Sequence, residues 1–181
     1  MKWLYYVKCV VWFQTCFNNL FEFLMNDAHI HLLVNHLPII LPIIAIIARI
    51  VAFFMDSDAL KRFAMIILIL SGIFAFASMQ SGERAEEMIE STVFFSETHI
   101  EAHEEAAETF AIFSYVIAVL AIVSLWADFT KKSFAMILTE ITLGLCIVSL
   151  YFAQKTGTTG GEIRHEEIRP SFVVPESEHH D

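Results

Sequence analysis

Four long apolar segments constrain the fold of this chain more than any other feature. They cover residues 32–55, 63–79, 110–127 and 134–153. A helix needs about 20 residues to cross the hydrocarbon core of a bilayer, and lipid offers no partners to unsatisfied backbone groups. Helices of a soluble bundle would show a polar face at the helical period, whereas these segments are apolar nearly all round. We therefore predict an all-α fold, an integral membrane four-helix bundle, rather than a soluble bundle.

The bulk composition agrees with this prediction and excludes several classes of protein. Hydrophobic residues make up 56% of the chain, and the mean hydropathy is +0.60. The net charge of -10 argues against nucleic-acid binding, which needs clustered Lys and Arg. The three cysteines form no Cys-x-x-Cys pair, so covalent c-type haem, a zinc ribbon and a disulfide scaffold are excluded. No catalytic triad, P-loop or zincin motif occurs, and enzymatic activity stays open.

The chain divides into three parts. Residues 26–169 hold the bundle, and residues 170–181 form a polar tail. Residues 1–25 are an apolar segment interrupted by polar residues. We expect an additional N-terminal helix there, either a weak fifth span or an amphipathic helix on the membrane surface. The alternative is that Met25 is the true start of the protein.

The links between the spans differ in charge. DSDALKR (56–62) and ADFTKKS (127–133) are short and contain Lys and Arg, whereas the long link 81–108 holds nine Glu and one Arg. Short links rich in Lys and Arg stay in the cytoplasm. We therefore expect a multi-pass protein of the bacterial inner membrane, with the acidic link on the periplasmic side.

Alternating span direction brings most of the histidines to that same side. Six of the eight lie at the corresponding ends of the spans: His29, His31, His36, His99, His103 and His165. His99 and His103 are four residues apart and share a face, since we extend the third helix back to about residue 97. His36 lies about one turn inside the apolar run, where an ionisable group should face the bundle interior and have a partner. Of the three histidines of the first span, we rank His36 first as a candidate ligand, His31 second and His29 last.

Four motifs, taken in order, resemble a known group of proteins. NHLPI, SGERAEE, IEAHEEAAE and GGEIRHEEIR are similar to a group of small prokaryotic membrane proteins of the Bacteroidetes type, related to a broader uncharacterised four-span family. The positions that carry the resemblance are His31, His36, Pro38, Gly82, His103, Gly160, Gly161 and His165. Some relatives are joined to c-type cytochrome domains. The resemblance therefore implies a c-type cytochrome or another respiratory membrane protein as partner, beside the lipid bilayer.

Haem b is the first cofactor that this pattern suggests. A haem in a four-helix bundle needs two axial imidazoles from facing helices. His36 and His103 would supply them, with His31 and His165 as alternates. Backbone could approach the macrocycle at three glycines, and two arginines could neutralise its propionates. These are Gly82, Gly160, Gly161, Arg84 and Arg164.

Two other functions remain open at this stage. One is a transition-metal site without haem, for which the candidate ligands are His36, His99, His103, Glu104, Glu108 and His165. The other is a non-catalytic membrane subunit or partner-binding protein, whose polar cluster only ties helix ends together. In that case the stretch TGTTGG would be a helix stop and turn.

Overall fold

The computed structural model describes residues 27–89 and 96–173, and in these ranges every regular element is helical. The elements are α2 (Asp27–Val34), α3 (Leu37–Met55), α4 (Asp58–Ile89), α5 (Glu97–Phe129), α6 (Ala135–Arg164) and the short 3₁₀ helix η1 (Glu166–Ile168). The expected N-terminal helix in residues 1–25 and the end of the tail lie outside the described residues.

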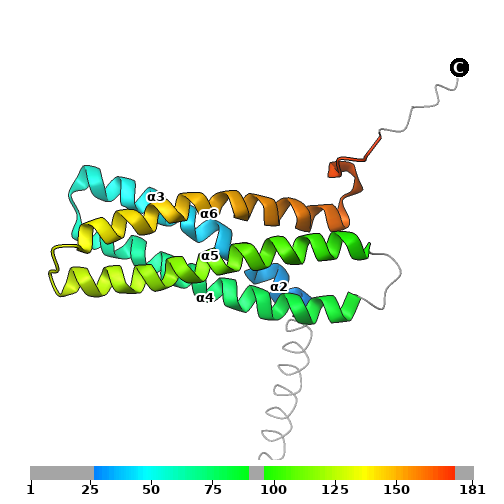
Figure 1. Ribbon diagram of the computed structural model, residues 1–181, viewed down its shortest axis with the longest axis horizontal. Helices are drawn as coiled ribbons and strands as arrows, with labels where there is room; N and C mark the ends of the chain where they lie inside the picture. Colours follow the sequence, from blue (N-terminus) through cyan, green and yellow to red (C-terminus); the bar gives the residue numbers. More distant parts are fainter. Residues whose placement is uncertain (1–26, 90–95, 174–181) are drawn as a thin grey trace, which may run out of the picture.

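The four long helical units run alternately up and down in a bundle (Figure 1). We call its two ends the histidine end and the cationic end. The histidine end is where α2 and α5 begin and α4 and α6 end, and the cationic end is where α3 and α5 end and α4 and α6 begin. Extensive contacts join α3 to α4, α4 to α5 and α5 to α6, whereas α3 touches α6 only slightly, and α2 packs on α4.

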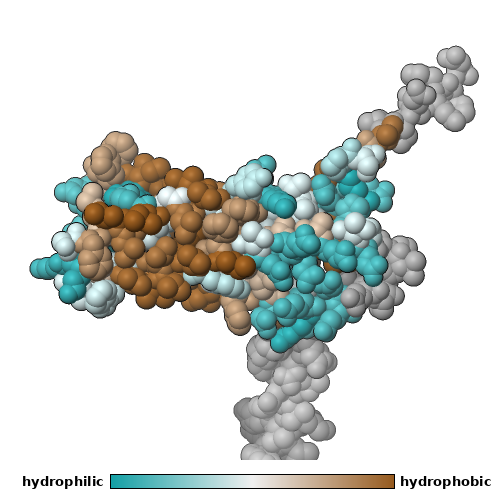
Figure 2. All heavy atoms as spheres, in the orientation of Figure 1, coloured by the Kyte–Doolittle hydropathy of each residue, from teal (hydrophilic) through white to brown (hydrophobic). Residues whose placement is uncertain are grey.

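Within the described residues, four helical units are long and apolar enough to cross a membrane: 27–55, 58–88, 97–129 and 135–164. Helix length and hydropathy therefore confirm the predicted four-span bundle, and by the same criteria the chain is a multi-pass membrane protein. On the face that Figure 2 shows, apolar side chains cover the half of the bundle next to the cationic end, and hydrophilic ones cover the surface toward the histidine end. The helix α5 has 33 residues and is therefore about 50 Å long, whereas the hydrocarbon core is about 30 Å thick. We infer that the histidine end projects beyond the hydrocarbon.

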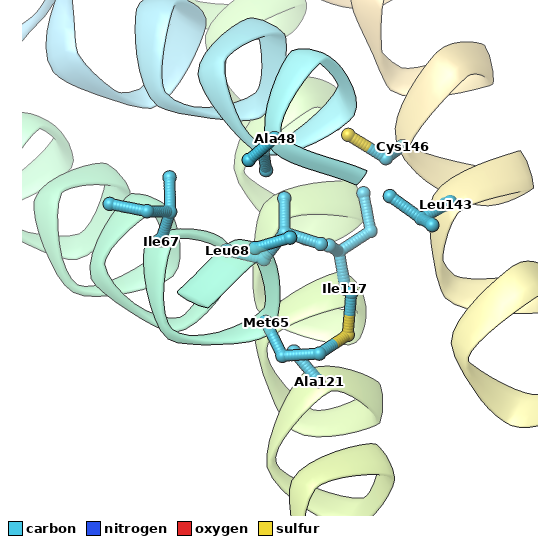
Figure 3. Close-up of a cluster of buried hydrophobic side chains, with 10 residues drawn as sticks. Ala48, Met65, Ile67, Leu68, Ile117, Ala121, Leu143 and Cys146 are labelled. Atoms are coloured by element: carbon cyan, nitrogen blue, oxygen red, sulfur yellow. The ribbon is translucent and has the colours of Figure 1, made fainter. Parts of the chain in front are cut away.

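Small side chains fill the contacts between helices, and large apolar side chains point outward. Ala45, Ala64 and Ala121 are fully buried in one cluster with Leu68 and Cys146. Figure 3 shows Ala121, Leu68 and Cys146 of this cluster. Large exposed side chains such as those of Ile47, Phe76, Ile112 and Ile147 cover the outer surface. Lipid tails are as apolar as Leu, so helices in a membrane associate by close packing and polar contacts. This distribution is typical of helices packed in lipid.

The first span is broken, a feature that its apolar run did not reveal. Asn35 and His36 form a turn between α2 and α3, and Pro38 follows in the first turn of α3. Pro42 lies inside α3 and has no N–H to donate to the carbonyl of Pro38. The Ser71 hydroxyl of α4 donates to that carbonyl instead, at 3.1 Å. A neighbouring helix thus satisfies the group that proline leaves open.

We predict that Gly72→Ala destabilises the bundle and that Gly144→Ala does not. A Cβ at Gly72 would lie 2.5 Å from Cβ of Ala118 and 3.3 Å from the Ser114 carbonyl oxygen, whereas one at Gly144 would meet nothing within 4 Å. Overpacking of this kind costs about 1–3 kcal/mol. Thermal unfolding of the two variants in the same detergent tests this, and equal midpoints would contradict the close approach of α4 and α5.

Candidate functional site

The imidazole of His31 is held against the end of α4. Its Nδ1 lies 3.0 Å from the carbonyl oxygen of Ser78. A carbonyl only accepts, so Nδ1 carries the proton and donates it. The hydroxyl of Ser81 lies 3.4 Å from the same nitrogen. Gly82 makes room for the ring, since a Cβ there would lie 3.2 Å from Cε1 of His31.

The imidazole of His103 is held against the end of α6 in the same way. Its Nδ1 lies 3.1 Å from the carbonyl oxygen of Thr156 and 3.2 Å from the hydroxyl of Thr159. A Cβ at Gly160 would lie 2.9 Å from Cε1 of His103. Thr156 also fixes α6 to α5, because its hydroxyl donates to the carbonyl of Ala106 at 2.9 Å.

The two arrangements share one pattern. In each, the accepting carbonyl belongs to the residue four before the glycine, and the hydroxyl to the residue one before it. The stretches are SMQSG (78–82) and TGTTG (156–160). Both imidazoles are half-buried at the histidine end, where α4 and α5 pack against each other. Two helix pairs, α2 with α4 and α5 with α6, therefore present equivalent imidazoles to one region.

The pattern fixes the chemistry of each ring. With Nδ1–H donating to a carbonyl, the neutral imidazole carries its lone pair on Nε2. None of the hydrogen bonds described for His31 or His103 engages Nε2. A carbonyl partner on the far nitrogen is also what orients histidines that bind metals. Each ring is thus prepared to give Nε2 to a metal ion or to a hydrogen-bond donor.

His36 is placed differently from the sequence expectation. It caps the start of α3 at the break in the first span, and its side chain is exposed. The inward orientation was inferred from the depth of His36 in the apolar run, whereas the turn at Asn35 and His36 leaves its side chain exposed. Of His31 and His36, His31 is the one whose ring is hydrogen-bonded to α4.

The other expected metal ligands do not gather around these two rings. Glu104 and Glu108 are exposed on α5. His99 is half-buried, and its Nδ1 has no hydrogen-bond partner among the described residues. In residues 27–89 and 96–173, no group of three or more His, Cys, Asp or Glu side chains converges in a geometry that could hold a metal ion.

The end of α6 is a separate polar contact. His165 caps α6, and its Nδ1 lies 2.9 Å from a carboxylate oxygen of Glu167. A hydrogen bond from its own backbone and the one from His165 lower the pKa of the Glu167 carboxyl. Arg169 donates to the carbonyl of Glu162 at 2.8 Å. Gly161 leaves space for Ile168, whose Cδ1 would lie 2.9 Å from an added Cβ.

The stretch TGTTGG is helical, contrary to its interpretation as a helix stop and turn. The helix α6 continues through these residues to Arg164, about three turns beyond the predicted end of the span. Hydroxyls in this stretch bond the preceding turn, as Thr156 does with Phe152 and Thr159 with Lys155.

The two expected propionate partners lie at the histidine end. Arg84 is exposed and lies 3.4 Å from a carboxylate oxygen of Asp27, which links α4 to the start of α2. Arg164 is exposed in the last turn of α6. Neither side chain is buried against His31 or His103.

Sequence reasoning missed the residues that position the two imidazoles: Ser78, Ser81, Thr156 and Thr159. The sequence does carry a sign of these residues. SMQSG (78–82) and TGTTG (156–160) both consist of Ser or Thr, two further residues, Ser or Thr, and then Gly. The carbonyl partner itself has no signature, because every residue carries one.

Comparison of the chain with known protein families, with curated proteins and with solved structures gave no significant match.

We predict that His103 is an Nδ1–H tautomer in the purified protein and that Gly160→Ala changes this state. The added methyl would displace the ring from the Thr156 carbonyl. Gly157→Ala is the matched control, since a Cβ there meets nothing within 4 Å. The measurement is ¹⁵N NMR of histidine-labelled protein, with His103→Gln to assign the signal. An identical His103 signal in both alanine variants would contradict the arrangement.

Proposed function

We propose that this protein is a membrane redox protein that binds one haem b between His31 and His103. The observation that supports the proposal is the matched pair of imidazoles, each fixed through Nδ1 with Nε2 left available. Two protein imidazoles are what a six-coordinate haem iron requires. A structural zinc site takes four protein ligands instead.

Sequence reasoning ranked His36 and His103 first, and the present proposal replaces His36 with His31. His36 is exposed, whereas His31 is half-buried, lies at the same end of the bundle as His103, and is hydrogen-bonded to α4. We therefore assign the axial positions to His31 and His103. Arg84 and Arg164 remain candidates for the propionates, because both lie at the histidine end.

A bound haem would supply one-electron chemistry, and the protein would set its potential through the axial ligands and their partners. A carbonyl that accepts from Nδ1–H makes the imidazole a stronger donor to the metal. The hydroxyls of Ser81 and Thr159 lie beside the same nitrogens. The partner that we propose is a c-type cytochrome or another respiratory membrane protein, in keeping with the resemblance to the uncharacterised four-span family.

A single transition-metal ion on the same imidazoles is the second candidate. The observation that favours it is His99, whose buried Nδ1 has no partner among the described residues and which lies one turn before His103. Metal analysis of the sample used for spectroscopy separates the two candidates. Stoichiometric metal without a haem spectrum would favour the ion over haem.

We predict a Soret band in detergent-purified protein expressed with sufficient haem, and a shift of that band on reduction with dithionite. His31→Ala and His103→Ala should each lower the haem content severalfold, because each removes one axial ligand. His36→Ala is the matched control and should retain the band, since its ring is exposed. A band lost with His36→Ala and kept with His31→Ala would reverse the assignment.

We also predict the orientation of the bundle, with the histidine end on the periplasmic side. The test uses single cysteines at two exposed positions, Glu101→Cys and Lys131→Cys, in a chain whose three native cysteines are replaced by Ala. An impermeant thiol reagent applied to spheroplasts should label Glu101→Cys, and should label Lys131→Cys only after lysis. The opposite labelling would place the site in the cytoplasm.

A further inference from the structure

A polar cleft of about 260 Å³ opens at the cationic end of the bundle. Its charged lining comes from α3, α4, α5, α6 and the link that follows α5. The charged side chains that line it are four cations and three carboxylates: Arg49, Asp58, Lys61, Arg62, Asp128, Lys132 and Glu140. The cleft lies at the opposite end of the molecule from His31 and His103.

Ion pairs hold the walls of this cleft together. Arg49 of α3 donates to Glu140 of α6, and Arg62 of α4 donates to Asp128 of α5 at 2.6 Å. The Arg49 side chain is only 13% exposed. Ionisable groups at such positions in membrane helices are costly and are commonly found at functional sites.

These ion pairs do not engage every hydrogen-bond donor that lines the cleft. Nε of Arg49 is buried and has no hydrogen-bond partner among the described residues. Lys132 lies over the ring of Trp126, 5.7 Å from its centroid, and no carboxylate in the described part of the chain pairs with it. The lining therefore offers the ammonium group of Lys132, beside the guanidinium of Arg49, to an anion that enters from outside.

A second cavity, of about 310 Å³, adjoins the first and is apolar in character. It shares Arg49, Met136 and Glu140 with the polar cleft and adds Ile50 and Phe53. It lies between the end of α3 and the start of α6, the two neighbouring helices that touch each other least. Ile50 and Phe53 are exposed on the lipid-facing surface.

We infer that the cationic end binds one anionic phospholipid. The phosphate group would lie in the polar cleft with Arg49 and Lys132, and an acyl chain would follow the groove lined by Ile50, Phe53 and Met136. Guanidinium and ammonium groups bind phosphate oxygens through charge-assisted hydrogen bonds. Basic pockets between membrane helices on the cytoplasmic side recognise lipid headgroups in this way. The inference stands on this end of the bundle alone and does not depend on the haem.

The experiment measures lipid retention by native mass spectrometry and thermal stabilisation in detergent. Phosphatidylglycerol and phosphatidylcholine are compared at equal concentration, with inorganic phosphate as a third addition. We expect one tightly held phosphatidylglycerol and a higher unfolding midpoint with that lipid only. Equal binding of the two lipids, or equal stabilisation by inorganic phosphate, would overturn the inference.

Matched variants locate the site. Lys132→Gln should weaken phosphatidylglycerol binding about fivefold, the factor expected for one Lys beside an anionic surface. Lys131→Gln makes the same charge change at an exposed neighbour that does not line the cleft. Ile50→Trp should block the groove, whereas Ile47→Trp, one turn away and outside the groove, should not. Equal effects within either pair of variants would overturn the inference.

Discussion

Close approach between helices is the constraint on which the rest of this molecule depends. Helices in lipid gain little from burying large apolar side chains against one another, so they must pack backbone near backbone. Gly72 against Ala118 is one such contact, at the centre of the bundle. Gly82 and Gly160 use the same device at the histidine end, where the space left by a missing side chain is filled by an imidazole from the neighbouring helix. A packing rule for membrane helices thus becomes the means of placing two imidazoles.

Three polar side chains in the bundle find a partner on the backbone of a neighbouring helix. Ser71 donates to the carbonyl of Pro38, His31 to that of Ser78, and His103 to that of Thr156. A polar group without a partner is costly in hydrocarbon, and these bonds fix each side chain in one orientation. The two ends of the molecule then differ in chemistry. One presents imidazoles bound through Nδ1 to backbone carbonyls, and the other presents cations linked to carboxylates around a cleft.

Much of the architecture could be predicted because membrane helices follow from length and hydropathy. The four spans and the start of the third helix at residue 97 are confirmed. The inward placement of His36 was inferred from its depth in the apolar run, whereas its side chain is exposed at the turn between α2 and α3. The role of Gly82 and Gly160 was expected to be contact with a cofactor, whereas each lies against a histidine ring. The carbonyl partners could not be predicted, since they depend on the register between helices and carry no sequence signal.

The proposed function requires that His31 and His103 bind the same haem. Low-temperature electron paramagnetic resonance of the oxidised protein tests this most directly, because the ferric spin state reports the axial ligands. The account predicts a low-spin signal of a haem with two imidazole ligands. That signal should be replaced by a high-spin signal in His31→Ala and in His103→Ala. A low-spin signal that survives either substitution would contradict the account, as would the absence of any ferric haem signal from haem-replete wild-type protein.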